Sequence, residues 1–538
     1  MHDEPPARAG RREWAGFAVL ALPTALLGLD VTALYLVVPS LAADLRPTTA
    51  ETLWIMDIYG FLIAGFLITM GTLGDRFGRR RLLMIGMAAF GAASVLAAFA
   101  PDALWLIVAR ALLGVAGATL MPSTLALIGD MFADARQRAL AIGAWATMFA
   151  LGMAAGPVVG GVLTAGFWWG AAFLIAVPVS AVVLIAAPRL LPEFRTDAGR
   201  PDLVSVGLSL AAVLPTVYAV KHAAAHGIDA RALTAVLLGG GSAVAFVRRQ
   251  LRLEEPLLDM RLFADRAFSA ALAVLLVGLV GFGGMMLLVT QHLQLVEGLS
   301  PTAAGLWMGP PALAMLTGGI GAPLLATRVP PGAVMGSALA LSLVGYASLA
   351  LVGPDGKVTV VSAFAFLYLG LGVMAALGTD IVVGAAPAER SGSAAALSET
   401  VQEFGVAAGV ALLGSLATAV YRTSVEAAPG MPRQVAEPYR DSLFGATSVA
   451  DELPPSALRH AQDASTSGLN TAAIAAGAVI AAATVVSFRA LRGIPPIGTA
   501  AAEAKPTTAS VPVRAELGGG ERVRTEPIAS ACVRDDDR

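Results

Sequence analysis

The stretch GTLGDRFGRRRLL, residues 71–83, joins two long apolar runs of the chain. Gly71 and Gly74 allow two helices to approach closely, and Gly78 permits a tight turn between them. Arginines gathered in so short a connection are typical of a loop at a membrane surface, on the side where cations collect. The stretch therefore predicts two membrane-spanning helices joined by a tight polar turn.

The same alternation of apolar runs and short polar connections continues along most of the chain. Of its 538 residues, 57% are hydrophobic and 14% are charged, whereas soluble proteins carry about 25% charged residues. A helix needs about 20 predominantly apolar residues to cross a bilayer. We expect fourteen transmembrane helices: 14–39, 52–72, 82–100, 103–128, 139–163, 171–187, 203–223, 231–248, 267–290, 302–325, 332–352, 358–386, 393–421 and 468–489.

Arginines collect in the loops that follow even-numbered spans, from the stretch at 71–83 to the connection between 248 and 267. By the positive-inside rule, both termini are then cytoplasmic, and the protein is a multi-pass protein of the cell membrane. The net charge of −2 gives no indication of nucleic-acid binding, because the cations are spread over many loops. Cys532 is the single cysteine, which excludes a disulfide within the chain and a cysteine-based metal site.

Three charged side chains of the stretch at 71–83 follow an ordered pattern. Asp75 is an anion among the cations Arg76 and Arg79, and it could accept hydrogen bonds from the positive N-terminal end of a neighbouring helix. The arginines alone fit an ordinary positive-inside loop equally well. The order of glycines, acid and arginines is more specific than charge alone.

A second pattern, LGMAAGPVVGG, occupies residues 151–161 of the fifth span. Glycines recur every four residues and form one flat helical face for close packing, while proline removes a backbone hydrogen bond and permits a kink. A general helix-packing face would look similar. The residues concerned are Gly152, Gly156, Pro157, Gly160 and Gly161.

Both patterns resemble signatures of the major facilitator superfamily: the loop G-x-L-a-D-r-x-G-r-k-x-x-l and the antiporter motif G-x-x-x-G-P-x-x-G-G. Arg110, which opens RALLGVAGATLMPS, matches the arginine of the superfamily's fourth helix. The stretches LDVTALYLVVPSLAADL, WIMDIYGFLIAGF, FWWGAAFLIAVP and GLSPTAAGL resemble the fourteen-span drug:proton antiporter branch, and within it the quaternary-ammonium exporters of the QacA and SmvA type.

The resemblance implies an all-α fold of two six-helix lobes with two extra helices between them. It divides the chain into a cytoplasmic N-terminus (1–13), an N-terminal lobe (14–187), a linker region with the two extra helices (188–266) and a C-terminal lobe (267–489). An external loop covers 423–467, and a disordered cytoplasmic tail covers 493–538. We interpret the loop and the tail as linkers.

Acids inside apolar spans are costly, so each is a candidate functional residue. Asp30 and Asp57 belong to the outer half of the N-terminal lobe, and Glu399 and Glu403 share one face in the inner half of the thirteenth span. Asp380 lies at a similar inner depth. The resemblance implies proton coupling, with Asp30 first among these acids and Arg110 as a partner; a purely structural Asp30–Arg110 pair is the alternative.

Aromatic and soft side chains near these acids suit flat lipophilic cations, although each could equally be part of the core. Some relatives have an aspartate in the tenth span where this chain has Met315, which favours monovalent or larger lipophilic substrates, with Asp380 as a candidate replacement. The candidate substrate-binding residues are Tyr35, Tyr59, Trp145, Phe149, Phe282, Met285, Trp307 and Met315.

The sequence thus predicts a transporter that exports lipophilic, mostly cationic drugs or biocides, driven by a proton gradient and without a cofactor or metal. The expected partners are the lipid bilayer, the substrates and protons, but no nucleic acid, and we expect a monomer. Export of a specific endogenous metabolite or antibiotic is an alternative, and import is a weaker one. An enzyme is disfavoured, because no nucleophile–base pair or P-loop is present. A sensor that transports nothing stays open.

Overall fold

A computed structural model of the chain describes residues 9–132, 134–193, 202–253, 256, 260–353, 356–385, 391–426 and 431–496. Thirteen helices in these ranges are long and apolar enough to cross a membrane. A fourteenth helix, α9, has a shorter apolar stretch over Leu203–Ala219. The prediction of an all-α polytopic membrane protein is confirmed. The predicted tail lies outside the described residues from position 497 onward.

The first six spans build the N-terminal lobe. Two of them are interrupted, because the helix stops for a few residues after Gly117 and again at Ile175. Glycine at position 78 has a positive φ of 106° and ends one helix while starting the next, as the tight turn at 71–83 predicts. The helices are α1 (Arg11–Leu45), α2 (Thr49–Phe77), α3 (Arg79–Ala98), α4 (Ala103–Gly117), α5 (Leu120–Met131), α6 (Ala135–Gly166), α7 (Ala171–Leu174) and α8 (Ala176–Leu190).

The last six spans build the C-terminal lobe. The predicted tenth span is interrupted at Met308, and the predicted ninth span continues beyond Gln291 into a π-helical turn. The elements are η1 (Met260–Ala264), α11 (Arg266–Gln291), η2 (His292–Val296), α12 (Pro301–Trp307), α13 (Gly309–Ala326), α14 (Pro331–Leu349), α15 (Lys357–Gly384), α16 (Ser391–Ser424) and α19 (Pro455–Ala490).

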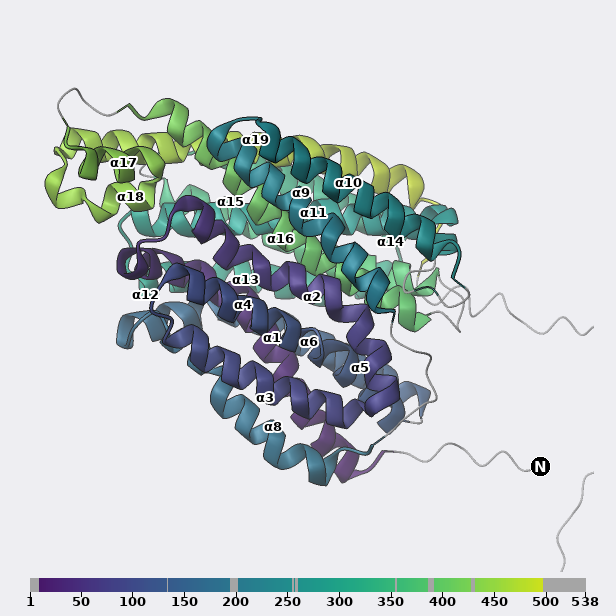
Figure 1. Ribbon diagram of the computed structural model, residues 1–538. Helices are drawn as coiled ribbons and strands as arrows, with labels where there is room; N and C mark the ends of the chain where they lie inside the picture. The colour runs from purple at the N-terminus through teal and green to yellow at the C-terminus, as the bar shows by residue number, and fades with distance from the viewer. Residues whose placement is uncertain are drawn as a thin grey trace, which may run out of the picture. The chain divides into compact units, whose positions relative to one another are not determined.

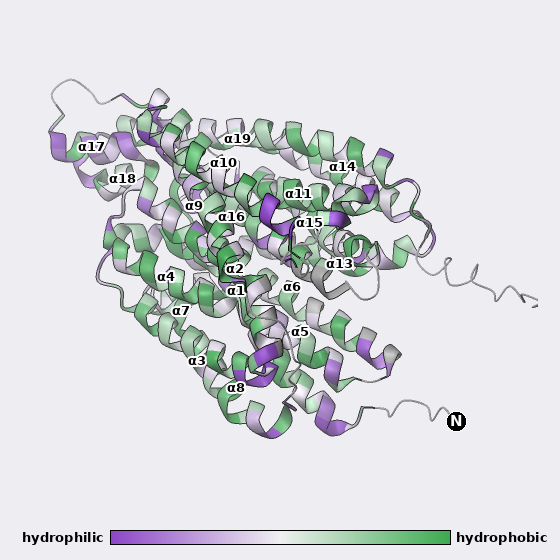
Figure 2. Cartoon of the chain, turned by 45° about the vertical axis from the view of Figure 1, so that its right-hand side comes forward, coloured by the Kyte–Doolittle hydropathy of each residue, from purple (hydrophilic) through white to green (hydrophobic). Residues whose placement is uncertain are grey.

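Successive spans alternate in direction, so α1 begins and α19 ends at the same end of the bundle, here called the N-terminal end. Figure 1 shows two short helices, α17 (Arg433–Asp441) and α18 (Leu443–Ser448), at the opposite end, here called the cap end. In Figure 2, hydrophobic residues cover much of the long helices, while α17 is largely hydrophilic. This distribution is the one that a bilayer around the long helices requires.

The predicted external loop at 423–467 is more ordered than a linker. Besides α17 and α18, it contains η4 (Ala450–Glu452), and α19 starts at Pro455, thirteen residues (468 − 455) before the predicted span. The segment has its own apolar cluster, in which the Tyr421 hydroxyl donates to the Tyr439 carbonyl at 2.8 Å. Its interpretation as a simple linker is wrong, because these tertiary contacts fold it.

The two extra helices, α9 (Leu203–His226) and α10 (Ala230–Gln250), pack against each other and differ in exposure. α10 exposes a row of apolar side chains, as expected for a surface that faces lipid. α9 instead contacts α2 of one lobe and α16 of the other. There, Val217 joins Phe61 of α2 and Ala407 of α16 in a small apolar cluster. We call this cluster the α9 seam.

An ion pair fastens the N-terminal end of α9 to the last turn of α10. Arg249 donates two hydrogen bonds to Asp202, at 2.9 and 3.1 Å, and Asp202 also caps α9 through the Ser205 amide. The hydrogen bonds from Arg249 lower the pKa of Asp202 from 3.8 to about 2. The ionised carboxylate therefore contributes stability above pH 4, which is lost as the pH falls through the folded-state pKa.

We expect Asp202→Asn to lower the free energy of unfolding by on the order of 1 kcal/mol at pH 7, since the pair is only partly buried. Asparagine keeps the helix cap, so the substitution removes the charge alone. Thermal unfolding of the detergent-solubilised protein should show a difference from the unmodified chain that narrows between pH 4 and pH 2. A difference that does not change over this range would contradict the assignment to the ion pair.

Candidate functional site

Arg110 on α4 is the central charged residue of the N-terminal lobe, with only 2% of its surface exposed. Its Nη1 donates to Asp30 Oδ2 of α1 at 2.8 Å, and its Nε donates to the Ile55 carbonyl of α2 at 3.2 Å. The guanidinium also lies over the ring of Tyr59, 4.3 Å from the centroid. One side chain thus connects three helices, as a buried arginine that cannot lose its proton requires.

Asp30 forms an ion pair with Arg110 but is not fully buried. Its side chain is 13% exposed, compared with 2% for that of its partner Arg110. The alternative that Asp30 pairs with Arg110 therefore describes the observed geometry, while the remaining exposure leaves the carboxylate within reach of a proton. Whether the pair couples protons to transport stays a prediction.

A small cavity joins the two lobes beside this ion pair. Arg110, Tyr35 and Tyr59 line it from the N-terminal lobe, and Glu403 lines it from α16. Its volume is about 20 Å³, which is room for a single water molecule. The Glu403 side chain makes no hydrogen bond or ion pair to a described residue and is largely buried. We call this space the central cavity.

The other predicted acids do not line the central cavity. Asp57 is fully buried within α2, and Glu399 is half-buried one turn from Glu403 toward the N-terminal end. Asp380 is exposed near the end of α15. The structure thus places Glu403 in one cavity with Arg110, the partner of Asp30, and leaves Asp380 apart. The sequence predicts a different arrangement, with the acids of the N-terminal lobe in its outer half and Glu403 in the inner half of its span.

Of the predicted substrate-binding residues, Tyr35 and Tyr59 line the central cavity. The others lie elsewhere. Trp145 donates to the Thr124 hydroxyl at 3.0 Å, and Phe282 packs against Tyr368 at 5.1 Å between ring centroids. Met285 and Met315 are buried, Phe149 and Trp307 are half-buried, and Lys357 Nζ is 5.8 Å from the Trp307 ring.

The turn at 71–83 brings α2 and α3 close to α5. Gly74 lies against the side chain of Leu82, and Gly71 lies against Pro122. Arg79 donates to Asp130 at the end of α5, at 2.7 Å. Arg76 is exposed. The side chain of Asp75, for which we predict a hydrogen bond to a helix end, lies outside the described residues.

The glycine face of α6 packs mainly against α1, the helix that carries Asp30. A Cβ added at Gly152 would lie 2.1 Å from the Ala25 carbonyl oxygen, and one at Gly156 would lie 2.0 Å from the Thr32 hydroxyl. Gly160 is in similar contact with Ala33. These separations leave no room for a side chain, so the glycines set the distance between α1 and α6.

Two residues of the same motif face the other lobe. A Cβ added at Gly161 would lie 2.3 Å from the Pro301 carbonyl oxygen of α12. A Cβ added at Gly305 would lie 2.6 Å from the Pro157 carbonyl oxygen, and the Thr302 hydroxyl donates to the Gly161 carbonyl at 3.2 Å. The motif therefore positions Asp30 on one side and holds the two lobes together on the other.

Sequence reasoning missed two partners of Arg110. One is the Ile55 carbonyl, which no residue type signals. The other is Phe173 of α7, whose ring centroid is 5.9 Å from the guanidinium carbon. Phe173 belongs to the quoted stretch FWWGAAFLIAVP, and the presence of a buried arginine would have been a reason to look there for an aromatic partner.

Comparison with known proteins gives consistent results. The profile described as Major Facilitator Superfamily matches residues 20–410. The "Multidrug efflux pump LfrA" of Mycolicibacterium smegmatis is 44% identical over 486 residues, which cover 89% of this chain and 96% of the relative. The "Methyl viologen resistance protein SmvA" of Salmonella typhimurium is 34% identical over 452 residues, covering 82% and 90%.

Among solved structures, a bacterial homologue of the human lysosomal transporter Spinster, in an inward-facing and unoccupied conformation, superposes with a TM-score of 0.63. The superposition covers 90% of this chain and 98% of the homologue, at 18% sequence identity. At that identity the similarity supports the fold alone.

Proposed function

Because the chain belongs to the Major Facilitator Superfamily, we propose that it exports lipophilic, mostly cationic drugs or biocides in exchange for protons. Membership makes the protein a membrane transporter. The names of two relatives, a multidrug efflux pump and a methyl viologen resistance protein, support drugs and organic cations as the substrate class. We further propose that the N-terminal end of the bundle is cytoplasmic, that the cap end is external and that the protein acts as a monomer.

The observation that carries this proposal is the central cavity, which is lined by Glu403 of one lobe and by Arg110, the partner of Asp30, of the other lobe. A carboxylate at the middle of a bundle is costly unless something neutralises it. A proton or an organic cation can neutralise Glu403, but not both at once. Entry of one therefore favours release of the other, which is the physical basis of antiport.

The Asp30–Arg110 pair gives this exchange a connection to the N-terminal lobe. Protonation of Asp30 would remove the anion that holds Arg110, and the guanidinium could then turn toward Glu403 across the same cavity. Asp30 and Glu403 would thereby share the Arg110 guanidinium. Which of the two carboxylates is paired with it would differ between the states of the transport cycle. No cofactor is required, since the proton gradient supplies the free energy.

The aromatic residues of the central cavity support a cationic substrate. Tyr35 and Tyr59 line the wall beside Glu403, and aromatic rings attract organic cations. A cavity of about 20 Å³ is far too small for a drug. The lobes must therefore move apart before the substrate binds, as alternating access demands.

We expect Glu403→Gln to reduce proton-driven uptake of a fluorescent cation into acid-loaded proteoliposomes by about tenfold or more. Glutamine keeps the size of the side chain and removes the site for which proton and cation compete. Asp380→Asn is the matched control, because it neutralises an exposed acid of the same lobe outside the central cavity. The control should transport at nearly the rate of the unmodified protein.

The reverse result, with Asp380→Asn inactive and Glu403→Gln active, would overturn the assignment. The direction of transport is tested separately in cells. Cells that express the unmodified protein should accumulate less dye than cells without it, and an uncoupler should remove the difference. Higher accumulation in expressing cells would indicate an importer.

A further inference from the structure

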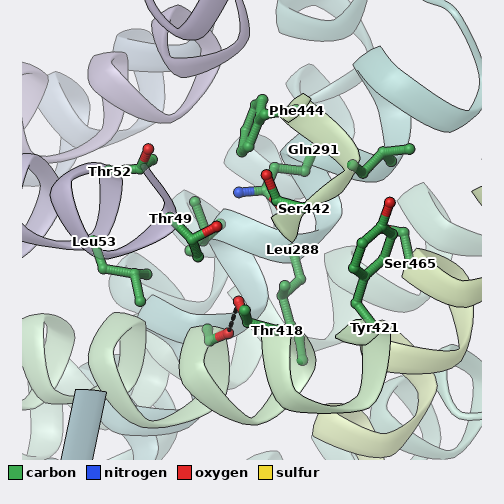
Figure 3. Close-up of a pocket in the computed structure, with 14 residues that line it drawn as sticks. Thr49, Thr52, Leu53, Leu288, Gln291, Thr418, Tyr421, Ser442, Phe444 and Ser465 are labelled. Atoms are coloured by element: carbon green, nitrogen blue, oxygen red, sulfur yellow. Dashed lines mark hydrogen bonds between the residues drawn. The ribbon is translucent and has the colours of Figure 1, made fainter. Parts of the chain in front are cut away.

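The helices α17 and α18, residues 433–448, are here called the cap. A second cavity lies beside the cap, between the two lobes, and is separate from the central cavity. Figure 3 shows residues of its wall: Thr49 and Leu53 from α2, Thr418 from α16, and Ser442 and Phe444 at the start of α18. Its volume is about 60 Å³, which is room for only a few water molecules. We call this space the capped cavity.

The lining of the capped cavity is amphiphilic and uncharged. Hydroxyl oxygens of threonine and serine alternate with leucine side chains, and the rings of Tyr421 and Phe444 form part of the wall. Hydroxyl oxygens and aromatic faces both attract an organic cation, but more weakly than a carboxylate does. A cation that moves from Glu403 to this cavity therefore enters a weaker site. A gradient of this kind favours release.

Contacts that cross between the lobes fix part of the wall of the capped cavity, where Thr49 and Ser442 line it. Asp441, at the end of α17, accepts hydrogen bonds from the Thr49 hydroxyl at 2.6 Å and from the Thr49 amide at 3.2 Å. The same carboxylate pairs with Arg422 at the end of α16. Thr49 is the first residue of α2, so Asp441 connects the N-terminal lobe to the C-terminal lobe. We call this contact the Asp441 latch.

The cap cannot move without breaking the Asp441 latch. α18 follows Asp441 directly, its Leu443 and Ala446 are buried, and it also packs against α1. Because Ser442, Leu443 and Phe444 line the cavity, a displacement of α18 opens it. A hydrogen bond to a charged group contributes about tenfold to a hundredfold to such an equilibrium, which is strong enough to hold the cap and weak enough to release it.

We propose that the capped cavity is a release site for a lipophilic organic cation and that the Asp441 latch must open before the cation can occupy it. This inference rests on the proposed function for the identity of the ligand and on the contacts above for the latch. The cavity has no room for such a cation while the cap is in place. The cation therefore occupies it only after Asp441 has lost its hold on Thr49.

The latch is tested by the accessibility of a cysteine placed in the capped cavity. In a Cys532→Ser background, Leu53→Cys introduces a single buried thiol. Intact cells treated with an uncoupler are labelled with a membrane-impermeant maleimide. Adding Thr49→Val removes the hydroxyl donor to Asp441, and we expect labelling to become about tenfold faster. Labelling at an unchanged rate would overturn the latch.

The matched control for this variant is Thr423→Val. The Thr423 hydroxyl donates to Val420 within its own helix, so its loss breaks no contact between lobes. This control should label at the rate of the Leu53→Cys protein alone. Equal acceleration by Thr423→Val and Thr49→Val would mean that the cap loosens generally, and would contradict a specific latch.

The release site is tested by protection from labelling in the Thr49→Val background. Tetraphenylphosphonium added outside should slow the labelling of Leu53→Cys several-fold, while tetraphenylborate, an anion of the same shape, should not. Equal protection by both ions, or by neither, would overturn the cation site. The uncoupler makes the labelling measurement independent of proton-driven transport. Labelling that slows with tetraphenylphosphonium in a protein that shows no efflux would reject the proposed function. Efflux by a protein whose labelling does not respond to tetraphenylphosphonium would reject this inference.

Discussion

Replacement of Arg110 by alanine is expected to abolish proton-driven export, with a loss of at least a hundredfold. The substitution leaves the Asp30 carboxylate and the Ile55 carbonyl without the donor that both share. Breaking one side of a buried ion pair costs about 3–5 kcal/mol, so we also expect a lower melting temperature. Arg110→Lys should retain only part of the stability. Lysine keeps the positive charge, but one ammonium cannot bond both acceptors and stack on Tyr59 in the same geometry.

The neutral pair Asp30→Asn with Arg110→Gln separates a structural role from a coupling role. It removes both charges together, so the melting temperature should recover relative to Arg110→Ala. Proton-driven export should not recover, because the proposed exchange needs a carboxylate that can be protonated. Thermal unfolding and uptake into proteoliposomes, measured on the same preparations, check both statements. A double variant that exports in response to the pH gradient would show that the pair is structural only.

Gly152→Ala is expected to destabilise the protein by about 3 kcal/mol or more. The added Cβ would lie 2.1 Å from the Ala25 carbonyl oxygen and 3.0 Å from the Leu29 amide, and both are backbone atoms. α1 and α6 must then separate, which shifts Asp30 relative to Arg110. We expect low yields of folded protein and little export. Fluorescence-detected size-exclusion chromatography after heating measures the first effect, and dye efflux measures the second.

Gly143→Ala is the matched control in the same helix. A Cβ added at Gly143 meets no atom within 4 Å, and alanine favours a helix interior over glycine by about 1 kcal/mol. The control should therefore be as stable as the unmodified chain, or slightly more stable. Similar losses in both variants would show that glycine at these positions provides flexibility of α6 and not close packing against α1.

Most of the fold could be predicted from the sequence, because a bilayer imposes one length on every span. Among the described residues, the runs of about 20 apolar residues correspond to the thirteen helices that are long and apolar enough to cross a membrane, and to the shorter apolar stretch of α9. The interruption after Gly117 could not be predicted from the apolar runs. The one at Met308 could have been, because Pro310 and Pro311 lie in the first turn after it and proline favours the first turn of a new helix. The folding of α17 and α18 was missed for a different reason. A proline-rich polar segment resembles a linker until its tertiary partners, such as Tyr421 with Tyr439, are known.

The candidate site could be predicted only as a set of residues. Asp30, Arg110 and Glu403 are unusual in apolar spans, so composition identifies them. Which of them meet depends on how each helix is rotated and how closely the helices approach. Gly60, for example, lies against Ala407 of the other lobe and beside the backbone of Glu403. Contacts of this kind join residues more than 300 positions apart, and a pattern of local spacing cannot reveal them.

The α9 seam has a consequence for how the lobes can move. Its members are aliphatic and aromatic side chains of three helices, among them Val217, Phe61 and Ala407. Apolar contacts have no preferred direction, so this flank can slide over a few ångströms without rupturing a polar bond. The two places therefore resist a rocking motion of the lobes unequally. The α9 seam resists it little, whereas at the cap end the hydrogen bonds of the Asp441 latch must break first. The lobes should consequently begin to separate at the cap end. During this movement α9 stays in contact with both lobes and keeps lipid out of the widening gap.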